Sequence, residues 1–301
     1  MKADHKLTNI PAPGEVNLDH TGHFISDTTL ASQILGDAGF TVTPFSAQVQ
    51  PDPDTGTMKL TGTGNICVML RQGYLEFLAQ TADTLLGREF KAALERRAGL
   101  HLVAFGTADS AARHAELSAA GHPMRPLVRM SRDIGTQDGS AKARFVVARL
   151  ADNAMPEGRV QMVTHRDESA LWQPGWLDHP NGVQALSAMV LSTPDPAKTA
   201  ARFAAFLDRP AHGRADGGFV IGLDRGALEI LPQDAAIALV GQPVEPERSA
   251  FAACRLMVAD IDATEAFFGK RGATFSRDAD RLILPFPAPL GIGAWIFEQS
   301  A

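Results

Sequence analysis

The sequence predicts an α+β fold in which four strand–helix–strand–strand–strand (βαβββ) modules pair into two pseudo-symmetric domains with concave, mostly antiparallel mixed sheets. Three observations lead to this prediction. A helix-like segment that begins at an Asp recurs along the chain, an apolar strand-like run precedes each copy, and two or three further runs follow it. The chain has 301 residues, which is enough for about two domains, and 45% of them are hydrophobic.

The helix signature has the same length, from an Asp to a Gly, at residues 27–39, 109–121 and 260–272. A fourth, looser copy begins at Asp195 and has Arg209-Pro210 where the Gly would stand. An Asp caps the first turn because its carboxylate accepts the free N–H groups there, and a Gly can close the last turn in the left-handed conformation. Each copy therefore predicts one short amphipathic helix.

The predicted strands stand before and after these helices. Those before them are residues 18–25, 100–105, 185–191 and 251–258. Those after them are residues 41–45, 66–70, 74–78, 144–150, 159–164, 219–223, 227–231, 281–284 and 293–297. Residues 50–64 and 131–141 are rich in turn formers and are predicted to be exposed loops. Because each helix must cross back over one face of its sheet, the concave face is left free for a ligand.

The spacing of the modules predicts the domain boundaries. We expect an N-terminal extension at residues 1–16, a first domain at 17–171, a linker at 172–182 and a second domain at 183–301. The linker, WQPGWLDHPNG, combines aromatic residues with Pro and Gly.

Composition excludes several classes of function. The formal charge of −6 argues against general binding to nucleic acid or an anionic membrane, and no apolar stretch has the length of a membrane helix. Cys67 and Cys254 form no C-x-x-C pair and lie in apolar runs, which predicts buried free thiols. With no apolar signal segment near Met1, we expect a cytoplasmic protein, and a homodimer is one expected assembly.

Short motifs in the first module resemble a known family. They are LDH at residues 18–20, Asp27, GFTV at 39–42, GTGN at 62–65 and GYLE at 73–76. In this order they resemble the glyoxalase-like domain group of the vicinal oxygen chelate superfamily, which includes glyoxalases, extradiol dioxygenases and fosfomycin- and bleomycin-resistance proteins. The resemblance covers the first module by motif and the other three by pattern.

The resemblance implies one divalent metal ion on the concave sheet. Its ligands would be a His near the start of a module's first strand and a Glu on its last strand, doubled across two modules. The matching positions in modules one to four are His20 and Glu76, Leu102 and Gln161, Ala188 and Glu229, and Ala253 and Ile296. The resemblance therefore implies Zn, Fe, Mn or Ni bound by His20, Glu76 and Gln161, with Glu76 also acting as a catalytic base.

Each of these residues also has a simpler interpretation. Glu76 lies in an apolar strand and needs a metal, a proton or an Arg such as Arg71 if it is buried. Strand alternation sends His20 to the face of Leu18 and His23 to the opposite face, and His20 could be a hydrogen-bonded core imidazole. Gln161 could hydrogen-bond a carbonyl group or be an ordinary polar strand residue. Glu229 has no His partner and is interpreted as a structural remnant of the duplication.

Further residues are candidates for binding substrate. His101 and His165 could supply a third imidazole if a β-bulge shifts their strands by one residue. Trp172 and His179, together with Trp176 and Asn181, combine aromatic area and polar tips at the predicted linker, where ligand pockets between domains often lie. A packed linker is the alternative.

The sequence favours a metal-assisted enzyme over other chemistries. The G-x-S-x-G, Walker and dinucleotide motifs are absent. The leading hypothesis is a glyoxalase-like lyase, isomerase or dioxygenase that acts on a small oxygenated carbonyl or diol compound, with the metal polarising the carbonyl group. The alternatives are a metal-free protein that binds or sequesters a small molecule, and a scaffold whose second half dimerises.

Overall fold

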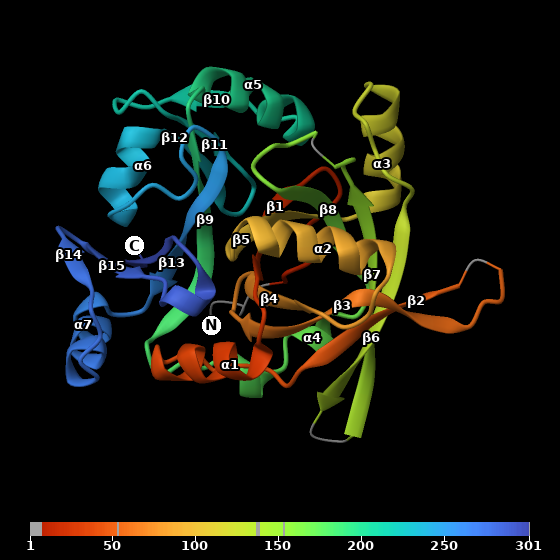
Figure 1. The fold of residues 1–301 in the computed structure, drawn as a ribbon, viewed down its shortest axis with the longest axis horizontal. Coiled ribbons are helices and arrows are strands. Elements are labelled where there is room, and N and C mark those ends of the chain that lie inside the picture. The colour runs from red at the N-terminus through yellow and green to blue at the C-terminus, as the bar shows by residue number, and fades with distance from the viewer. Residues whose placement is uncertain (1–7, 53, 137–138, 153, 301) are drawn as a thin grey trace, which may run out of the picture.

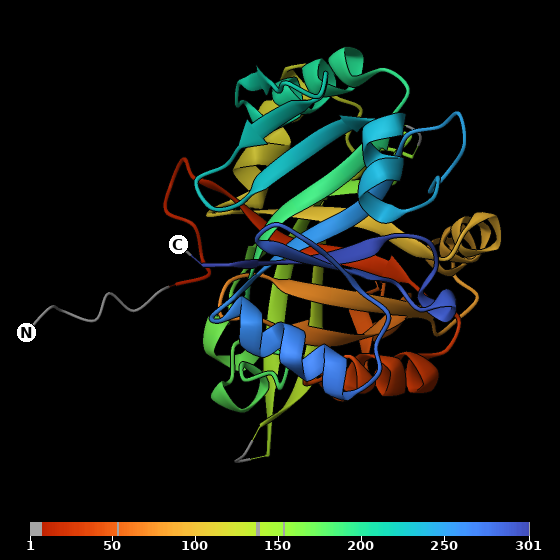
Figure 2. The same ribbon diagram turned by 90° about the vertical axis from the view of Figure 1, so that its left-hand side faces the viewer.

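Two eight-stranded mixed sheets form the framework of the protein in a computed structural model that describes residues 8–52, 54–136, 139–152 and 154–300 (Figures 1 and 2). The first sheet closes into a barrel in the order β1-β4-β3-β2-β6-β7-β8-β5. Its strands are β1 (Val16–Phe24), β2 (Ser46–Pro51), β3 (Met58–Met69), β4 (Tyr74–Gln80), β5 (Gly99–Thr107), β6 (Val128–Thr136), β7 (Gly139–Arg149) and β8 (Arg159–His165).

The second sheet is open and has the order β10-β11-β12-β9-β13-β16-β15-β14. Its strands are β9 (Val183–Thr193), β10 (Ala211–Gly213), β11 (Phe219–Gly222), β12 (Ala227–Pro232), β13 (Ala250–Val258), β14 (Ser276–Asp278), β15 (Arg281–Pro285) and β16 (Ala294–Gln299). The mixed α+β class is thus confirmed.

Seven helices accompany the sheets in the described part of the chain. They are α1 (Thr28–Asp37), α2 (Leu85–Arg96), α3 (Ser110–Ala119), α4 (Glu168–Leu171), α5 (Pro196–Leu207), α6 (Gln233–Val240) and α7 (Ile261–Lys270). Two short 3-10 turns lie at Pro174–Trp176 and Ala288–Leu290. The four predicted helices are α1, α3, α5 and α7, and each has the predicted Asp at its N-cap with a side-chain oxygen that accepts backbone N–H groups. None of these helices is long and apolar enough to cross a bilayer.

The two sheets share one apolar core. The neighbouring strands β1 and β5 of the barrel pack against β9 and β13 of the second sheet, and side chains such as Leu18, Phe105 and Met189 are fully buried there. A separate apolar cluster fills part of the barrel interior, with Phe24 and Phe145 among its members. The barrel wall therefore has an apolar outer face where it packs against the second sheet. Its inner face holds the polar residues described below.

Three predicted segments differ from the structure. Residues 50–64 and 131–141 are not loops, because most of their described residues belong to the β2–β3 and β6–β7 hairpins. Much of these hairpins is exposed or half-buried, so their strands lack the apolar pattern that marks a buried strand. Residues 41–45 form no strand, since Thr41 is held by the linker, with its N–H donating to His179 Nδ1 at 3.0 Å.

A bulge in β1 sets the direction of His20. Leu18 pairs with Phe105 on β5 whereas His20 pairs with Ala104, so Asp19 is an extra residue on β1. The prediction that His20 shares a face with Leu18 is therefore wrong. Leu18 belongs to the core between the sheets, whereas His20 lines the barrel interior.

Gly73 allows the chain to approach this bulge. It has φ +74°, and a Cβ atom on it would lie 2.8 Å from the carbonyl oxygen of Asp19. The N–H of Gly73 donates to Asn9 Oδ1 at 3.0 Å. A larger residue could not take this position without moving β1.

Candidate functional site

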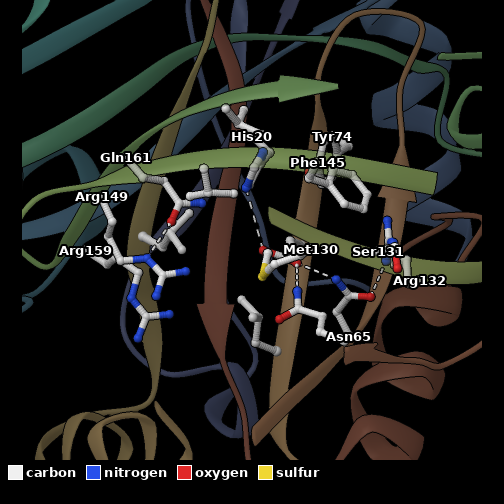
Figure 3. A pocket seen from close by; sticks show the side chains of 16 residues that line it. His20, Asn65, Tyr74, Met130, Ser131, Arg132, Phe145, Arg149, Arg159 and Gln161 are labelled. Atoms are coloured by element: carbon white, nitrogen blue, oxygen red, sulfur yellow. Dashed lines mark hydrogen bonds and ion pairs between the residues drawn. The ribbon is translucent and has the colours of Figure 1, made fainter. Parts of the chain in front are cut away.

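A pocket of about 530 Å³, counted to its open mouth, lies inside the barrel (Figure 3). Every residue that lines it belongs to a barrel strand. The polar lining residues are His20, Gln48, Asn65, Tyr74, Glu76, Ser131, Arg132, Arg149, Arg159 and Gln161. The remaining walls are apolar and include Leu78, Met130 and Phe145. A concave pocket with convergent polar groups is a candidate small-molecule site, and this lining is more polar than is usual for one.

Asp19 fixes the orientation of His20. Its Oδ1 lies 2.6 Å from His20 Nδ1 and 2.9 Å from His165 Nε2, and all three side chains are buried. Burial alone would raise the pKa of the Asp19 carboxyl, but the charges and hydrogen bonds of the two histidines lower it well below its usual range. Asp19 is therefore ionised and accepts a hydrogen bond from the Nδ1–H group of His20. In the neutral imidazole this tautomer leaves the lone pair on Nε2, which faces Glu76 in the pocket.

Glu76 faces His20 across the pocket. Its Oε1 accepts hydrogen bonds from Asn65 Nδ2 and from Gln48 Nε2, the latter at 3.2 Å, and Asn65 Oδ1 accepts one from Arg132. Its Oε2 lies 3.7 Å from His20 Nε2. The expected alternative partner, Arg71, is elsewhere and forms an ion pair with Asp178 at 2.6 Å. The network of amides holds one oxygen of Glu76 and leaves the other directed at His20 (Figure 3).

Aromatic rings surround the imidazoles. Tyr74 stacks on His20 with ring centroids 4.3 Å apart. Trp172 packs edge-on against Tyr74 and His165, at 6.0 and 5.1 Å, and is buried behind them rather than in the pocket lining. These contacts restrict the rotamers of both histidines.

Two arginines lie beside Gln161. Arg149 Nε donates to Gln161 Oε1 at 3.3 Å, and Arg159 lies over the Phe24 ring at 5.4 Å. Burial, the nearby Arg159 and Arg125 lower the pKa of Arg149 to about 9. The carbonyl oxygen of Gln161 is thus directed at a guanidinium rather than at His20 and Glu76.

The other predicted residues lie outside this pocket lining. His101 stacks on Phe24 near α2, and its Nε2 lies 2.7 Å from the carbonyl oxygen of Arg97. The predicted bulge in β5 does occur, because Gly22 pairs with Leu102 and His23 pairs with Leu100. It directs His101 away from His20. His179 bridges the linker to Met69, with Nε2 2.9 Å from its carbonyl oxygen.

The remaining linker residues belong to the packing of the linker. The side-chain amide of Asn181 donates to the carbonyl oxygen of Ala38, and Trp176 packs beside the barrel-interior cluster. These linker residues therefore pack against the barrel and α1.

The donors present fit a divalent cation with two protein ligands. His20 Nε2 and Glu76 Oε2 face each other, and no hydrogen bond among the described residues uses either atom. A neutral imidazole oriented by a carboxylate through its other nitrogen is the usual form of a metal-bound histidine. Gln161 does not complete the set, because Arg149 holds its carbonyl oxygen.

A second cluster of ligand atoms is explained without a metal. Asp19, His20 and His165 bring such atoms within 4.8 Å of one another. Their separations of 2.6 and 2.9 Å are hydrogen-bond lengths, so the cluster is better described as a carboxylate shared by two imidazoles.

Several residues of the pocket escaped the sequence analysis. Arg132 lies in a segment predicted to be a loop, so no face could be assigned to it. The sequence does contain a signal for Arg149 and Arg159. Both lie within or at the end of a predicted strand, next to apolar residues. A charged residue on a buried face needs a partner, as does a buried carboxylate.

The pocket lies inside a barrel whose element order gives two βαβββ units, β1-α1-β2-β3-β4 and β5-α3-β6-β7-β8. The glyoxalase-like domain family matches residues 18–207, which is more than half of the chain. The chain belongs to this family, and the predicted resemblance is confirmed.

Solved structures share the fold at low sequence identity. A hypothetical protein from Staphylococcus aureus is 12% identical, with a TM-score of 0.66 over 95% of this chain and 100% of that one. A mutant of 4-hydroxymandelate synthase from Streptomyces coelicolor is 16% identical, with a TM-score of 0.58 over 96% and 93%. A fusion of a xylose isomerase-like TIM barrel with 4-hydroxyphenylpyruvate dioxygenase is 10% identical, with a TM-score of 0.55 over 96% and 50%. The sequence matches no curated protein.

Proposed function

We propose that this chain is an enzyme that performs metal-assisted chemistry on a small oxygenated carbonyl or diol compound bound in the barrel pocket. The observation that carries the proposal is the pair of free, pre-oriented donor atoms, His20 Nε2 and Glu76 Oε2, 3.7 Å apart in that pocket. Family membership and the names of the structural neighbours, which include a synthase and a dioxygenase, support an enzyme.

The chain's own residues have separable roles in this proposal. When bound by His20 and Glu76, a divalent ion would polarise a substrate carbonyl group and stabilise negative charge on its oxygen. Asp19 holds His20 in the tautomer that leaves Nε2 free. Asn65 holds Oε1 of Glu76, so that Oε2 is left to bind the ion or, when released from it, to accept a proton from the substrate.

Metal analysis tests the proposal directly. Protein purified without chelator should contain about one divalent ion per chain, and His20→Ala and Glu76→Ala should each lose it. Asp19→Asn should weaken metal binding by roughly 10- to 100-fold, because the amide lacks the negative charge that orients His20 and raises the basicity of its Nε2. Inductively coupled plasma mass spectrometry measures the content, and titration after chelation measures the affinity.

Glu229→Ala is the matched control. Glu229 occupies the corresponding position of the second sheet but is bound to Arg255 at 2.7 Å, so its removal should leave the metal content unchanged. A metal-free wild type, or variants of His20 and Glu76 with wild-type metal content, would refute the proposal.

A metal-free binding protein of the same fold is the second candidate. The observation that favours it is the positive charge of the pocket lining, which holds Arg132, Arg149 and Arg159 but only one carboxylate, Glu76. A wild type without metal that still binds small molecules would favour this candidate. A cytoplasmic location and a homodimer stay predictions, which cell fractionation and light scattering can check.

A further inference from the structure

The barrel pocket has the opposite charge to the rest of the chain. The chain carries a formal charge of −6, but the lining holds three arginines and one carboxylate, a net charge of +2 with histidine neutral. A divalent ion at His20 and Glu76 would make the lining still more positive. A pocket of this sign concentrates anions.

Arg132 is compensated within the protein, whereas Arg149 and Arg159 are not. Arg132 donates to Asn65, which in turn donates to Glu76, so the charges of Arg132 and Glu76 are linked through one amide. Neither Arg149 nor Arg159 has a carboxylate within 4.0 Å among the described residues, and the nearby Glu89 forms a two-pronged ion pair with Arg125 at 2.8 Å.

Burial makes this lack of a partner costly. Arg149 is 7% exposed, and its one side-chain hydrogen bond within the described chain goes to the neutral Gln161. The burial of Arg149 and the repulsion from Arg159 both disfavour its charged form, as its lowered pKa of about 9 reflects. Buried arginines are almost always paired, so the buried Arg149 beside the half-buried Arg159, neither with a carboxylate within 4.0 Å in the described chain, indicates a site for an anion.

Arg149 and Arg159 line the same pocket as His20 and Glu76. Figure 3 shows Arg149 and Arg159 side by side next to Gln161, with His20 between them and the Asn65–Arg132 side of the pocket. Tyr74, which stacks on His20, and Phe145, which lies beside Arg132, add aromatic surface to the lining.

We propose that Arg149 and Arg159 form an oxyanion-binding subsite that holds a carboxylate or phosphate group of the substrate while its reacting oxygens face His20 and Glu76. The planar donor fork of an arginine matches either group. The subsite identifies the substrate class and in this respect rests on the proposed function. Anion binding itself needs no metal.

Calorimetric titration with three aromatic probes tests the subsite. Benzoate carries a carboxylate, phenyl phosphate carries a phosphate, and benzamide is a neutral isostere of benzoate. On chelator-treated wild-type protein, one of the two anions should bind at least tenfold more tightly than benzamide, and the better anion identifies the group. Arg149→Gln and Arg159→Gln should each weaken that anion by roughly tenfold or more and leave benzamide unchanged.

Thermal unfolding separates this role from a structural one. Since Arg149 is buried without a carboxylate, Arg149→Gln should raise the melting temperature of the free protein while it weakens anion binding. A structural arginine would give a lower melting temperature. Arg149→Lys, which keeps the charge but loses the donor fork, serves if the Gln variant does not fold, and should also weaken the anion.

Arg255→Gln is the control, since Arg255 is buried in the second sheet and paired with Glu229 and Glu298. It should leave anion binding intact. Equal affinity for benzoate, phenyl phosphate and benzamide, or anion binding that survives both Arg149→Gln and Arg159→Gln, overturns the subsite. Because these titrations use metal-free protein, their result is independent of the metal analysis. Either the anion subsite or the proposed metal-assisted function can therefore be refuted without the other.

Discussion

The barrel and the second sheet have the same register at their central strands but carry different side chains there. On β1, His20 lies opposite Ala104 of β5. At the corresponding point of β9, Ala188 lies opposite Arg255 of β13. The second sheet therefore has no imidazole at this position and carries a guanidinium on the neighbouring strand.

This exchange changes what happens to the acid on the last strand. Glu76 and Glu229 each lie two residues beyond the partner of His20 or Ala188 on the adjacent parallel strand. Glu229 is bound by Arg255 at 2.7 Å and by Arg214 at 3.3 Å, whereas Glu76 is held by amides through one oxygen only. The comparison teaches that one backbone can present the same carboxylate as a structural ion pair or as a free donor.

The helix after the fourth strand of each half also differs. Helix α6 lies against β9, β12, β13 and β15, and buries Ala236 and Val240 among the side chains on that face of the second sheet. Helix α2 instead packs mainly on β3 and inserts Phe90 next to Phe24 at one end of the barrel interior. The barrel keeps a pocket, while the corresponding face of the second sheet is filled.

The largest effect should come from Arg255→Ala. Arg255, Glu229 and the partly exposed Glu298 form a network, so removal of the arginine leaves a buried carboxylate without its main partner. We expect the free energy of unfolding to fall by about 3 to 5 kcal/mol in a urea titration.

Glu76→Gln in the barrel is the comparison variant. It keeps an oxygen that can accept from Asn65, so its loss should be about 1 kcal/mol or less. Similar decreases in the free energy of unfolding for Arg255→Ala and Glu76→Gln would contradict the distinction between Glu229 as a structural carboxylate and Glu76 as a free one.

A smaller effect should come from His23, which lies between the two sheets. It stacks on Phe77 at 4.6 Å and contacts Phe286 and Trp295, and neither ring nitrogen has a hydrogen-bond partner within the described residues. Burial, followed by the charges of Arg97 and His101, lowers the pKa of His23 to about 3. The unfolded chain therefore binds a proton between pH 6.5 and 3 that the folded chain does not, and stability is lost as the pH falls through this range.

Urea titrations at pH 7 and pH 5 measure this contribution. The His23→Phe variant should lose roughly 2 kcal/mol less than the wild type over this interval, because it has no imidazole to protonate on unfolding. Between pH 7 and pH 8 the two proteins should change in parallel. An equal acid sensitivity in both proteins would show that His23 is not held neutral by the core.

Local signals account for what the sequence predicted well. The four Asp-capped helices were found because a cap and an amphipathic turn are encoded within about twelve residues. The buried strands β5, β9 and β13 were predicted because they are mostly apolar, whereas β1, with five polar residues, was predicted from its place before an Asp-capped helix. Strands β2 and β6 and the adjoining ends of β3 and β7 were missed because much of their surface is exposed and only their pairing within the barrel defines them.

The sequence indicates only those features of the site that depend on one residue at a time. His20 and Glu76 do meet in one pocket, but the face of His20 depends on a bulge at Asp19, and a bulge is set by the neighbouring strand. The direction of the Gln161 carbonyl oxygen depends on Arg149, twelve residues earlier on another strand. Such pairings are decided by the tertiary structure, which periodicity along one strand does not contain.

The smallest effects should come from the helix caps, where the two halves are expected to behave alike. Asp27 of α1 and Asp260 of α7 each accept two backbone N–H groups, and replacement of either by Ala should cost about 1 kcal/mol. Asp195 of α5 accepts only the N–H of Lys198, and Pro196 has no N–H to satisfy, so Asp195→Ala should cost less. Urea titration of the three variants gives the order, and a larger loss for Asp195→Ala would mean that its contacts beyond the cap matter more than the cap itself.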